Sequence, residues 1–292
     1  MLVGHVTLSD LFCRSNEVQI LLWKTFIFVE GARQSMTANT ENTVQATETS
    51  LRLIEQIQEL DGATIAQLTD SLDVARSTVF AHLNTLRNNG YITKRGEVYH
   101  LDFKFLFLGE YTKRRDEAYE LSEAYVREMA AECDEYVDFC VEQDGRLLTV
   151  HLSINGIQNP QFEIGEYYHM TTTAQGKAIL ANLSEERIEG IIDQWGLPRR
   201  TENTITSKSA LFEELETIEK QGYAVSHQEC IEGLNAVAVP IFSPDGRVFG
   251  AFGISGPSYK MDDEMIETEL LEILTQGKDE FESEARELYL SL

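Results

Sequence analysis

Apolar residues between Ser50 and Asn88 recur every three or four positions, which is the spacing of one face of an α-helix. Asp61-Gly62 and Asp73-Val74 interrupt that spacing, so the pattern predicts three short helices. The positions expected to face their common core are Leu51, Ile54, Ile57 or Gln58, Leu60, Ile65, Leu68, Leu72, Val79, Leu83 and Leu86. Two stretches on either side of Gly96, residues 92–95 and 98–101, then predict a β-hairpin. Three helices followed by a hairpin are typical of a winged helix-turn-helix.

A further helical stripe predicts a connecting helix over residues 105–130. Its inward positions are Ala118, Leu121 or Ser122, Tyr125 and Met129. The basic triplet Lys113-Arg114-Arg115 lies near its start, either beside a phosphate backbone or at a solvated helix end. A helix in this place suits both dimerisation and signal transmission.

From residue 136 the pattern changes to an alternation of apolar and polar residues, which predicts strands. The expected strands are 136–142, 146–154, 162–170, 236–242 and 247–255. The last two are almost entirely apolar, so they should be central strands covered on both faces. The expected helices are 174–183, 184–195, 209–221 and a long one from Asp262. The fold class is therefore α+β, with a mainly antiparallel sheet in the C-terminal part.

The predicted organisation is a leader and tail (1–46), a winged helix-turn-helix (47–104), a linker helix (105–130) and a C-terminal domain (131–292). The leader contains one apolar run, residues 18–29, which is too short to span a membrane and lacks the marks of a secretory signal. We expect Met36 to be the natural start. The alternative is an extra helix that packs on the first domain.

The charge of the chain is distributed unevenly. The formal net charge is -25, and residues 109–292 carry 37 acidic against 15 basic side chains, a net charge of -22. Such acidity, with Arg preferred over Lys, favours a protein of a salt-rich, haloarchaeal type of cytoplasm over an ordinary acidic protein. Four widely spaced cysteines without a CxxC pair indicate reduced thiols and no metal site or cofactor.

One stretch departs from this acidity. Residues 74–95 contain no Asp or Glu and carry four basic residues, a local charge of +4. A carboxylate-free segment in so acidic a chain points to an anionic partner, and double-stranded DNA is the expected one. The residues expected to contact DNA are Arg76, Ser77, Thr78, Phe80, Ala81 and Asn84 on the third helix, with Lys94 and Arg95 on the hairpin. His82, at the edge of the core stripe, is read as mainly structural.

The run TIAQLTDSLDVARSTVFAHLNTLRNNGYI resembles the DNA-binding half of the IclR family of transcriptional regulators. In that family the third helix typically reads Ser-Thr-x-x-Arg-x-Leu. Ser77, Thr78 and Leu83 match, but Ala81 stands at the usual basic position. This departure leaves Arg76 and the hairpin as the main cationic contacts.

The runs TTTAQGKAILA, EKQGYAVSHQECIEGLNAVAVPIF and GRVFGAFGISGP resemble the effector-binding half of the same family, which has a GAF-like fold. The resemblance implies a small carboxylate effector, bound where the helix start and the ends of the central strands meet. The positions that it implies are Tyr168, Ala174, Gln175, Ser226, Leu234, Ala236, Gly253 and Ser255.

The residues themselves add an argument for an anion. Thr171, Thr172 and Thr173 precede a helix, and hydroxyls beside free N–H groups can hold an anion. Thr173 is equally well explained as a helix cap. Ser226, Ala236 and Gly253 stand where some family members have an acid, a thiol and a hydroxyl. Fewer polar anchors imply a less polar ligand, such as an aromatic acid, or a domain that has lost its ligand.

Two rival functions remain from the residues alone. His227 and Cys230 could suggest a thiol nucleophile, but an isolated H-x-x-C in an expected loop is weak support, and we expect no catalytic residues. A winged helix can also serve as a protein-interaction or anti-regulator module. We expect a cytoplasmic, effector-responsive regulator that reads a pseudo-palindromic operator as a homodimer or dimer of dimers, with no membrane partner.

Overall fold

The computed structural model describes residues 43–154 and 163–291 of the chain. The expected leader lies almost wholly outside the described residues. The chain divides after Glu110 into two compact units, and each is described by itself below. Within the described ranges, no helix is long and apolar enough to cross a membrane.

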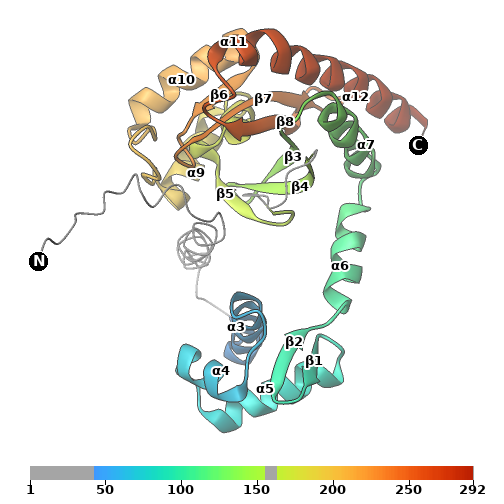
Figure 1. The fold of residues 1–292 in the computed structure, drawn as a ribbon, viewed down its shortest axis with the longest axis vertical. Helices are drawn as coiled ribbons and strands as arrows, with labels where there is room; N and C mark the ends of the chain where they lie inside the picture. The colour runs from blue at the N-terminus through green and yellow to red at the C-terminus, as the bar shows by residue number, and fades with distance from the viewer. Residues whose placement is uncertain (1–42, 155–162, 292) are drawn as a thin grey trace, which may run out of the picture. The chain divides into compact units, whose positions relative to one another are not determined.

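The first unit is the winged helix-turn-helix that the pattern predicts (Figure 1). Its elements are α3 (Gln45–Glu59), α4 (Ile65–Leu72), α5 (Arg76–Asn88), β1 (Ile92–Arg95) and β2 (Val98–Leu101). Thr64 begins α4 with a reciprocal capping box to Gln67, and Asp73 turns the chain into α5 in the left-handed conformation, with φ of 51°. The strands pair antiparallel, and β2 also bridges Ala63 through Tyr99.

In α3, the residues that are buried differ from those that the pattern predicted to face the core. The buried residues are Leu53, Ile57, Ala63, Leu68, Leu72, Val79, Leu83, Leu86, Ile92 and Tyr99. Leu51 and Leu60, expected inside, are 54% and 39% exposed. The helix docks through Leu53 and Ile57, one turn apart, and Ser50 beside that face reaches His82.

Two helices occupy the interval where a single linker helix was expected. These are α6 (Lys104–Lys113) and α7 (Glu117–Glu132). Residues 114–116 separate them, and the carboxylate of Asp116 accepts from the amide N–H of Ala118 to begin α7. A side chain that caps a new helix competes with continuation of the old one.

The second unit contains a six-stranded antiparallel sheet in the order β5-β4-β3-β8-β7-β6. The strands are β3 (Tyr136–Gln143), β4 (Arg146–Ile154), β5 (Tyr167–His169), β6 (Ala224–His227), β7 (Leu234–Phe242) and β8 (Val248–Pro257). Two of them differ from expectation. The strand expected over residues 162–170 is limited to β5 and is followed by the 3₁₀ turn η1 (Met170–Thr172). The strand β6 lies where a loop was expected. The apolar strands β7 and β8 are interior to the sheet, as predicted.

Helices cover both faces of this sheet (Figure 1). One face carries α7 and the C-terminal segment of α11 (Asp263–Met265), η2 (Ile266–Leu270, a π-helical turn) and α12 (Leu271–Ser291). The other face carries the short helix α8 (Ala174–Leu180), on which α10 (Lys208–Gln221) packs. The remaining helix, α9 (Glu185–Trp195), contacts the turn between β3 and β4 through Trp195 and Arg187.

Candidate DNA interface and effector site

The outward face of α5 has the residues that the helical pattern placed there. Arg76, Ser77, Thr78, Phe80 and Ala81 are exposed, with half of Phe80 accessible to solvent. These residues face solvent because Val79, Leu83 and Leu86 are buried on the opposite side of the helix. The N-cap residue, Ala75, provides no side-chain bond, so the N–H groups of Arg76 and Ser77 at the start of this 13-residue helix keep their donor capacity. This face can therefore meet phosphate and base edges.

Two of the predicted contact residues, Asn84 and Lys94, are engaged within the chain, and so is the neighbouring His82. Asn84 is half-buried and accepts a bond of 3.3 Å from Arg87 Nη2. Lys94 lies 3.3 Å from Glu97 and 5.3 Å from the ring centroid of Tyr99. His82 Nδ1 lies 2.8 Å from Ser50 Oγ, a structural contact between α5 and α3. Arg95, exposed at the hairpin end, is thus a freer cation than Lys94.

The sheet face under α8 has a floor of small residues, and the predicted effector residues meet there. Register places Asp138, Gly253, Ala238 and Ala224 in one row across β3, β8, β7 and β6. The next row is Tyr136, Ser255, Ala236 and Ser226. Cross-strand partners point to the same face, so Ser226, Ala236, Gly253 and Ser255 share one surface.

Gln175 closes this floor from above. Its amide Nε2 donates to both carboxylate oxygens of Asp138, at 2.8 and 2.9 Å. A Cβ at Gly253 would lie 2.3 Å from the same nitrogen, so glycine is what allows Gln175 to lie there. Asp138 is 3% exposed, and burial raises its pKa to about 7.

The three threonines before α8 have mostly structural duties. Thr173 Oγ1 accepts from the amide of Gly176, so this residue caps the helix. Thr172 Oγ1 donates to the carbonyl of His169. Thr171 Oγ1 is buried without a hydrogen-bond partner in the described part of the chain. The helix has only 7 residues, so its N-terminus adds little to an anion site.

The other residues implied by the resemblance border the same surface. Leu234 and Ala174 are buried, and Leu234 lies two residues before Ala236 on the same face of β7. Tyr168, on β5, is 9% exposed and donates its hydroxyl to Glu166. Burial, together with the neighbouring Glu166, raises the pKa of Tyr168 well above its usual value. The predicted residues therefore do converge in the interior, from five separate elements.

Sequence reasoning missed the charged residues of this interior. Asp138 alternates with the apolar Val137 and Phe139, which is also the pattern of a strand with one solvated face. Lys177, 1% exposed, lies 2.6 Å from Glu229 and 2.9 Å from Glu214. These two ion pairs tie α8 to α10 and to the segment between β6 and β7. Nothing local in the sequence distinguishes Lys177 from a solvated helix lysine.

His227 and Cys230 do not form a nucleophilic pair. His227 ends β6, a strand where a loop was expected, and its Nε2 lies 3.8 Å from Asp263. Burial raises the pKa of Cys230 to about 11, and its thiol bonds with Thr172. A thiol whose pKa is raised in this way is a poor nucleophile.

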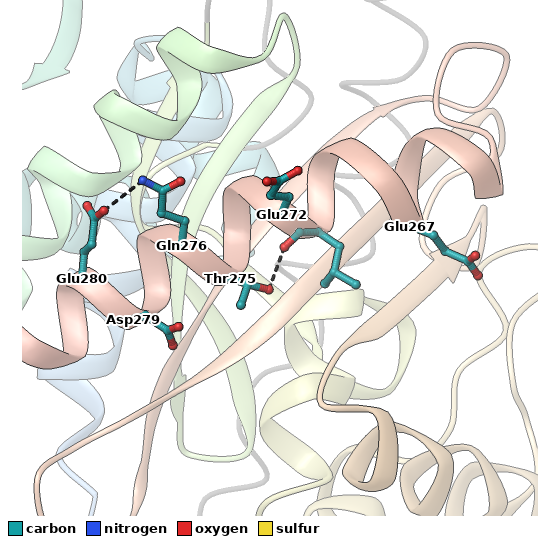
Figure 2. A pocket seen from close by; sticks show the side chains of 7 residues that line it. Glu267, Glu272, Thr275, Gln276, Asp279 and Glu280 are labelled. Atoms are coloured by element: carbon teal, nitrogen blue, oxygen red, sulfur yellow. Dashed lines mark hydrogen bonds between the residues drawn. The ribbon is translucent and has the colours of Figure 1, made fainter.

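A hollow of about 600 Å³ runs along η2 and α12 (Figure 2). Its lining residues are Glu267, Leu271, Glu272, Thr275, Gln276, Asp279 and Glu280. The side chains that carry charge there are all acidic and exposed, so it is a solvated helix face rather than a recognition site. Across residues 43–154 and 163–291, no group of three or more His, Cys, Asp or Glu side chains is placed to hold a metal ion.

Comparison with known proteins identifies both domains. Residues 46–96 match the IclR helix-turn-helix domain, and residues 111–280 match the C-terminal domain of bacterial IclR transcriptional regulators. A relative from Halobacterium salinarum, named "Probable HTH-type transcriptional regulator ArcR", is 28% identical over 222 residues, which are 73% of this chain and 82% of the relative.

Solved structures show the same fold. The Thermotoga maritima IclR structure superposes with a TM-score of 0.70 at 23% identity, covering 83% of this chain and 97% of that one. A double mutant of the inducer-binding domain of the PobR transcription factor from Acinetobacter, in complex with 3-hydroxybenzoic acid, matches with a TM-score of 0.52 at 21% identity. That match covers 56% of this chain and 96% of that domain. These relatives are regulators and not enzymes, and this chain belongs to the IclR family of DNA-binding transcriptional regulators, with a winged helix-turn-helix and a C-terminal effector domain.

Proposed function

We propose that the DNA contacts of this regulator come from Arg76, Ser77, Thr78, Phe80, Ala81 and Asn84 on α5, and from Lys94 and Arg95 on the hairpin. The observation that carries this assignment is the exposed, carboxylate-free face of α5 with its uncapped first turn. Because Lys94 is already paired with Glu97, Arg76 and Arg95 supply most of the attraction to phosphate. Ser77, Thr78 and Asn84 then supply contacts to base edges.

The regulator acts as a homodimer, or a dimer of dimers, on a pseudo-palindromic operator. Support comes from α6 and the residue before it, whose large apolar side chains face solvent. Phe103 is 83% exposed, Leu106 60%, Phe107 73% and Tyr111 72%. Apolar clusters of this kind on a surface are typical of association sites. Two subunits would double the phosphate contacts that a single +4 segment offers.

The C-terminal unit senses a small organic carboxylate, and an aromatic acid fits its weakly polar floor. Buried hydroxyls at Ser255 and Thr171 have no partner among the described residues and can donate to a carboxylate. The aromatic acid bound to the inducer-binding domain of PobR is the reason to test that class first. The setting of this activity is the cytoplasm, and the acidic composition favours a salt-rich one.

The DNA assignment is tested by gel shift on the upstream region of the chain's own gene, over a series of KCl concentrations. Arg76→Ala should weaken binding and lower the slope of log affinity against log salt by about 0.9. Arg247→Ala is the matched control, because this exposed arginine pairs with Asp245 in the other unit. Equal affinities for the wild type and Arg76→Ala at every salt concentration would remove α5 from the interface.

The effector assignment is tested by thermal shift of the full chain with a panel of aliphatic and aromatic carboxylates. Stabilisation by one of them, accompanied by a change in operator affinity, is the expected result. A panel without any stabilising acid would favour a domain that has lost its ligand.

A further inference from the structure

The floor of the effector site holds a buried carboxylate without a cation. Asp138 bonds to the amide of Gln175 and the thiol of Cys140, and no lysine or arginine within the described ranges pairs with it. A carboxyl group buried without a cation is costly to ionise, and for this reason the pKa of Asp138 is raised to about 7. Lys177, by contrast, is buried with two carboxylate partners nearby.

The Gln175 side chain covers the floor beside Asp138. It reaches from α8 across the floor, and the absence of a side chain at Gly253 is what leaves room for its amide. The floor around this point consists of Ala236, Ala238 and Gly253, none of which extends past Cβ. A glutamine side chain has three rotatable bonds, so it can withdraw without movement of the helix backbone.

A second polar group in the next row has no partner. Ser255 is 1% exposed, and its hydroxyl makes no hydrogen bond with any described residue. It lies on the same face as Asp138, two residues from Gly253 on β8. Asp138 and Ser255 together therefore offer carboxyl oxygens and a hydroxyl to a molecule that replaces the Gln175 amide.

We propose that Asp138 recognises the effector through an N–H donor group, an amine, amide or guanidinium, that takes the place of the Gln175 amide. The inference rests on the proposed effector function of this site and adds a second group to the ligand. A carboxylate alone would bring a second negative charge towards Asp138. An acid that also carries an N–H donor presents its carboxylate to the hydroxyls and its donor to Asp138.

The test uses pairs of acids that differ only in an N–H group. Succinamate and levulinate have the same shape, with NH₂ replaced by CH₃, and so do 4-aminobenzoate and 4-methylbenzoate. Binding of each to the full-length chain is measured by calorimetry and by thermal shift at constant salt and pH. The N–H member of at least one pair should bind about tenfold or more tightly than its methyl partner, since a hydrogen bond to a charged group is among the stronger ones.

Two variants assign that difference to the proposed residues. Asp138→Asn should remove most of the preference for the N–H member, while melting and operator binding in the absence of ligand show that the chain still folds. Gln175→Ala removes the internal competitor and should tighten binding of the N–H member without helping its methyl partner. This second variant keeps the test decisive if Asp138→Asn fails to fold.

The outcomes separate this inference from the function on which it rests. Equal binding of both members of a pair, in the wild type and in Gln175→Ala, overturns recognition by Asp138 but leaves a carboxylate-sensing site. Absence of binding by all four acids in both proteins overturns the inference and the effector assignment together.

Discussion

The two faces of the six-stranded sheet are built from the same strands but hold opposite kinds of side chain. Towards α7 and α12, β3, β7 and β8 present large apolar residues such as Val137, Phe139, Val239, Phe252 and Ile254. Towards α8 they present Asp138, Cys140, Ala236, Gly253 and Ser255. Both faces are buried, so the difference does not come from solvent.

The first face is packed as a core. Phe139, Phe249, Phe252 and Phe281 form a cluster with ring centroids 5.3–6.4 Å apart. Gly277 brings α12 against α7, because a Cβ there would meet Met129 Sδ at 2.6 Å. The second face carries small and polar side chains. These fill less volume, and some of their polar atoms have no hydrogen-bond partner among the described residues. The comparison teaches that one face maintains the fold while the other is available for recognition.

The largest expected effect is on the aromatic face. Phe139→Ala should lower the free energy of unfolding by up to about 5 kcal/mol, since it removes a fully buried ring from the centre of the cluster. Ala238→Gly, in a fully buried position on the opposite face, should cost only about 1 kcal/mol. Denaturant titration of both variants measures the difference, and similar losses would break the distinction between the faces.

The next effect is a pH dependence of stability that originates on the polar face. The pKa of Asp138, raised to about 7 by burial, lies above the value near 3.9 in the unfolded chain. The native state therefore binds this proton more tightly, so stability should fall as pH rises from about 4 to about 7, by up to about 1.4 kcal/mol per pH unit.

Asp138→Asn isolates that dependence. Denaturation curves of wild type and variant between pH 4 and pH 8 should differ in slope below pH 7 and run parallel above it. Glu135 and Glu229 also have pKa values raised by burial, but they are present in both proteins and cancel in the comparison. Parallel curves throughout would mean that Asp138 ionises as an ordinary aspartate.

A third test concerns Lys177, whose buried charge links α8 to α10 and to the segment between β6 and β7. Lys177→Met leaves Glu229 buried without its cation and should cost about 3 kcal/mol. Lys208→Met is the matched control, because its ion pair with Asp193 is exposed and should be worth less than about 1 kcal/mol. Adding Glu229→Gln to Lys177→Met should restore part of the loss, and no recovery would show that the pair is not the cause.

The smallest expected effect is at the cap of α8. Thr173→Ala removes the acceptor for the Gly176 amide and should cost about 1 kcal/mol, whereas Thr173→Ser keeps the hydroxyl and should cost less. Thermal melts of the two variants measure the difference. If Ser and Ala behave alike, the hydroxyl of Thr173 is not acting as a cap, and its role as an effector contact gains weight.

Local patterns predicted most of the helices and strands and the exposed face of α5. The spacing of Val79, Leu83 and Leu86 places one side of α5 inside, and the exposure of Arg76, Ser77 and Thr78 follows from helix geometry alone. The same holds for the hairpin around Gly96 and for the apolar strands β7 and β8. In each case the information lies within one or two turns of helix, or along a single strand.

The polar interior depended instead on how distant segments come together. Asp138 and Gln175 are 37 residues apart, and Lys177 and Glu229 are 52 apart. They meet because β3 pairs with β8 and because α8 covers the face where an alternating strand would ordinarily meet water. Periodicity states which residues share a face of a strand, but only the pairing of strands and the placing of helices determine what that face touches.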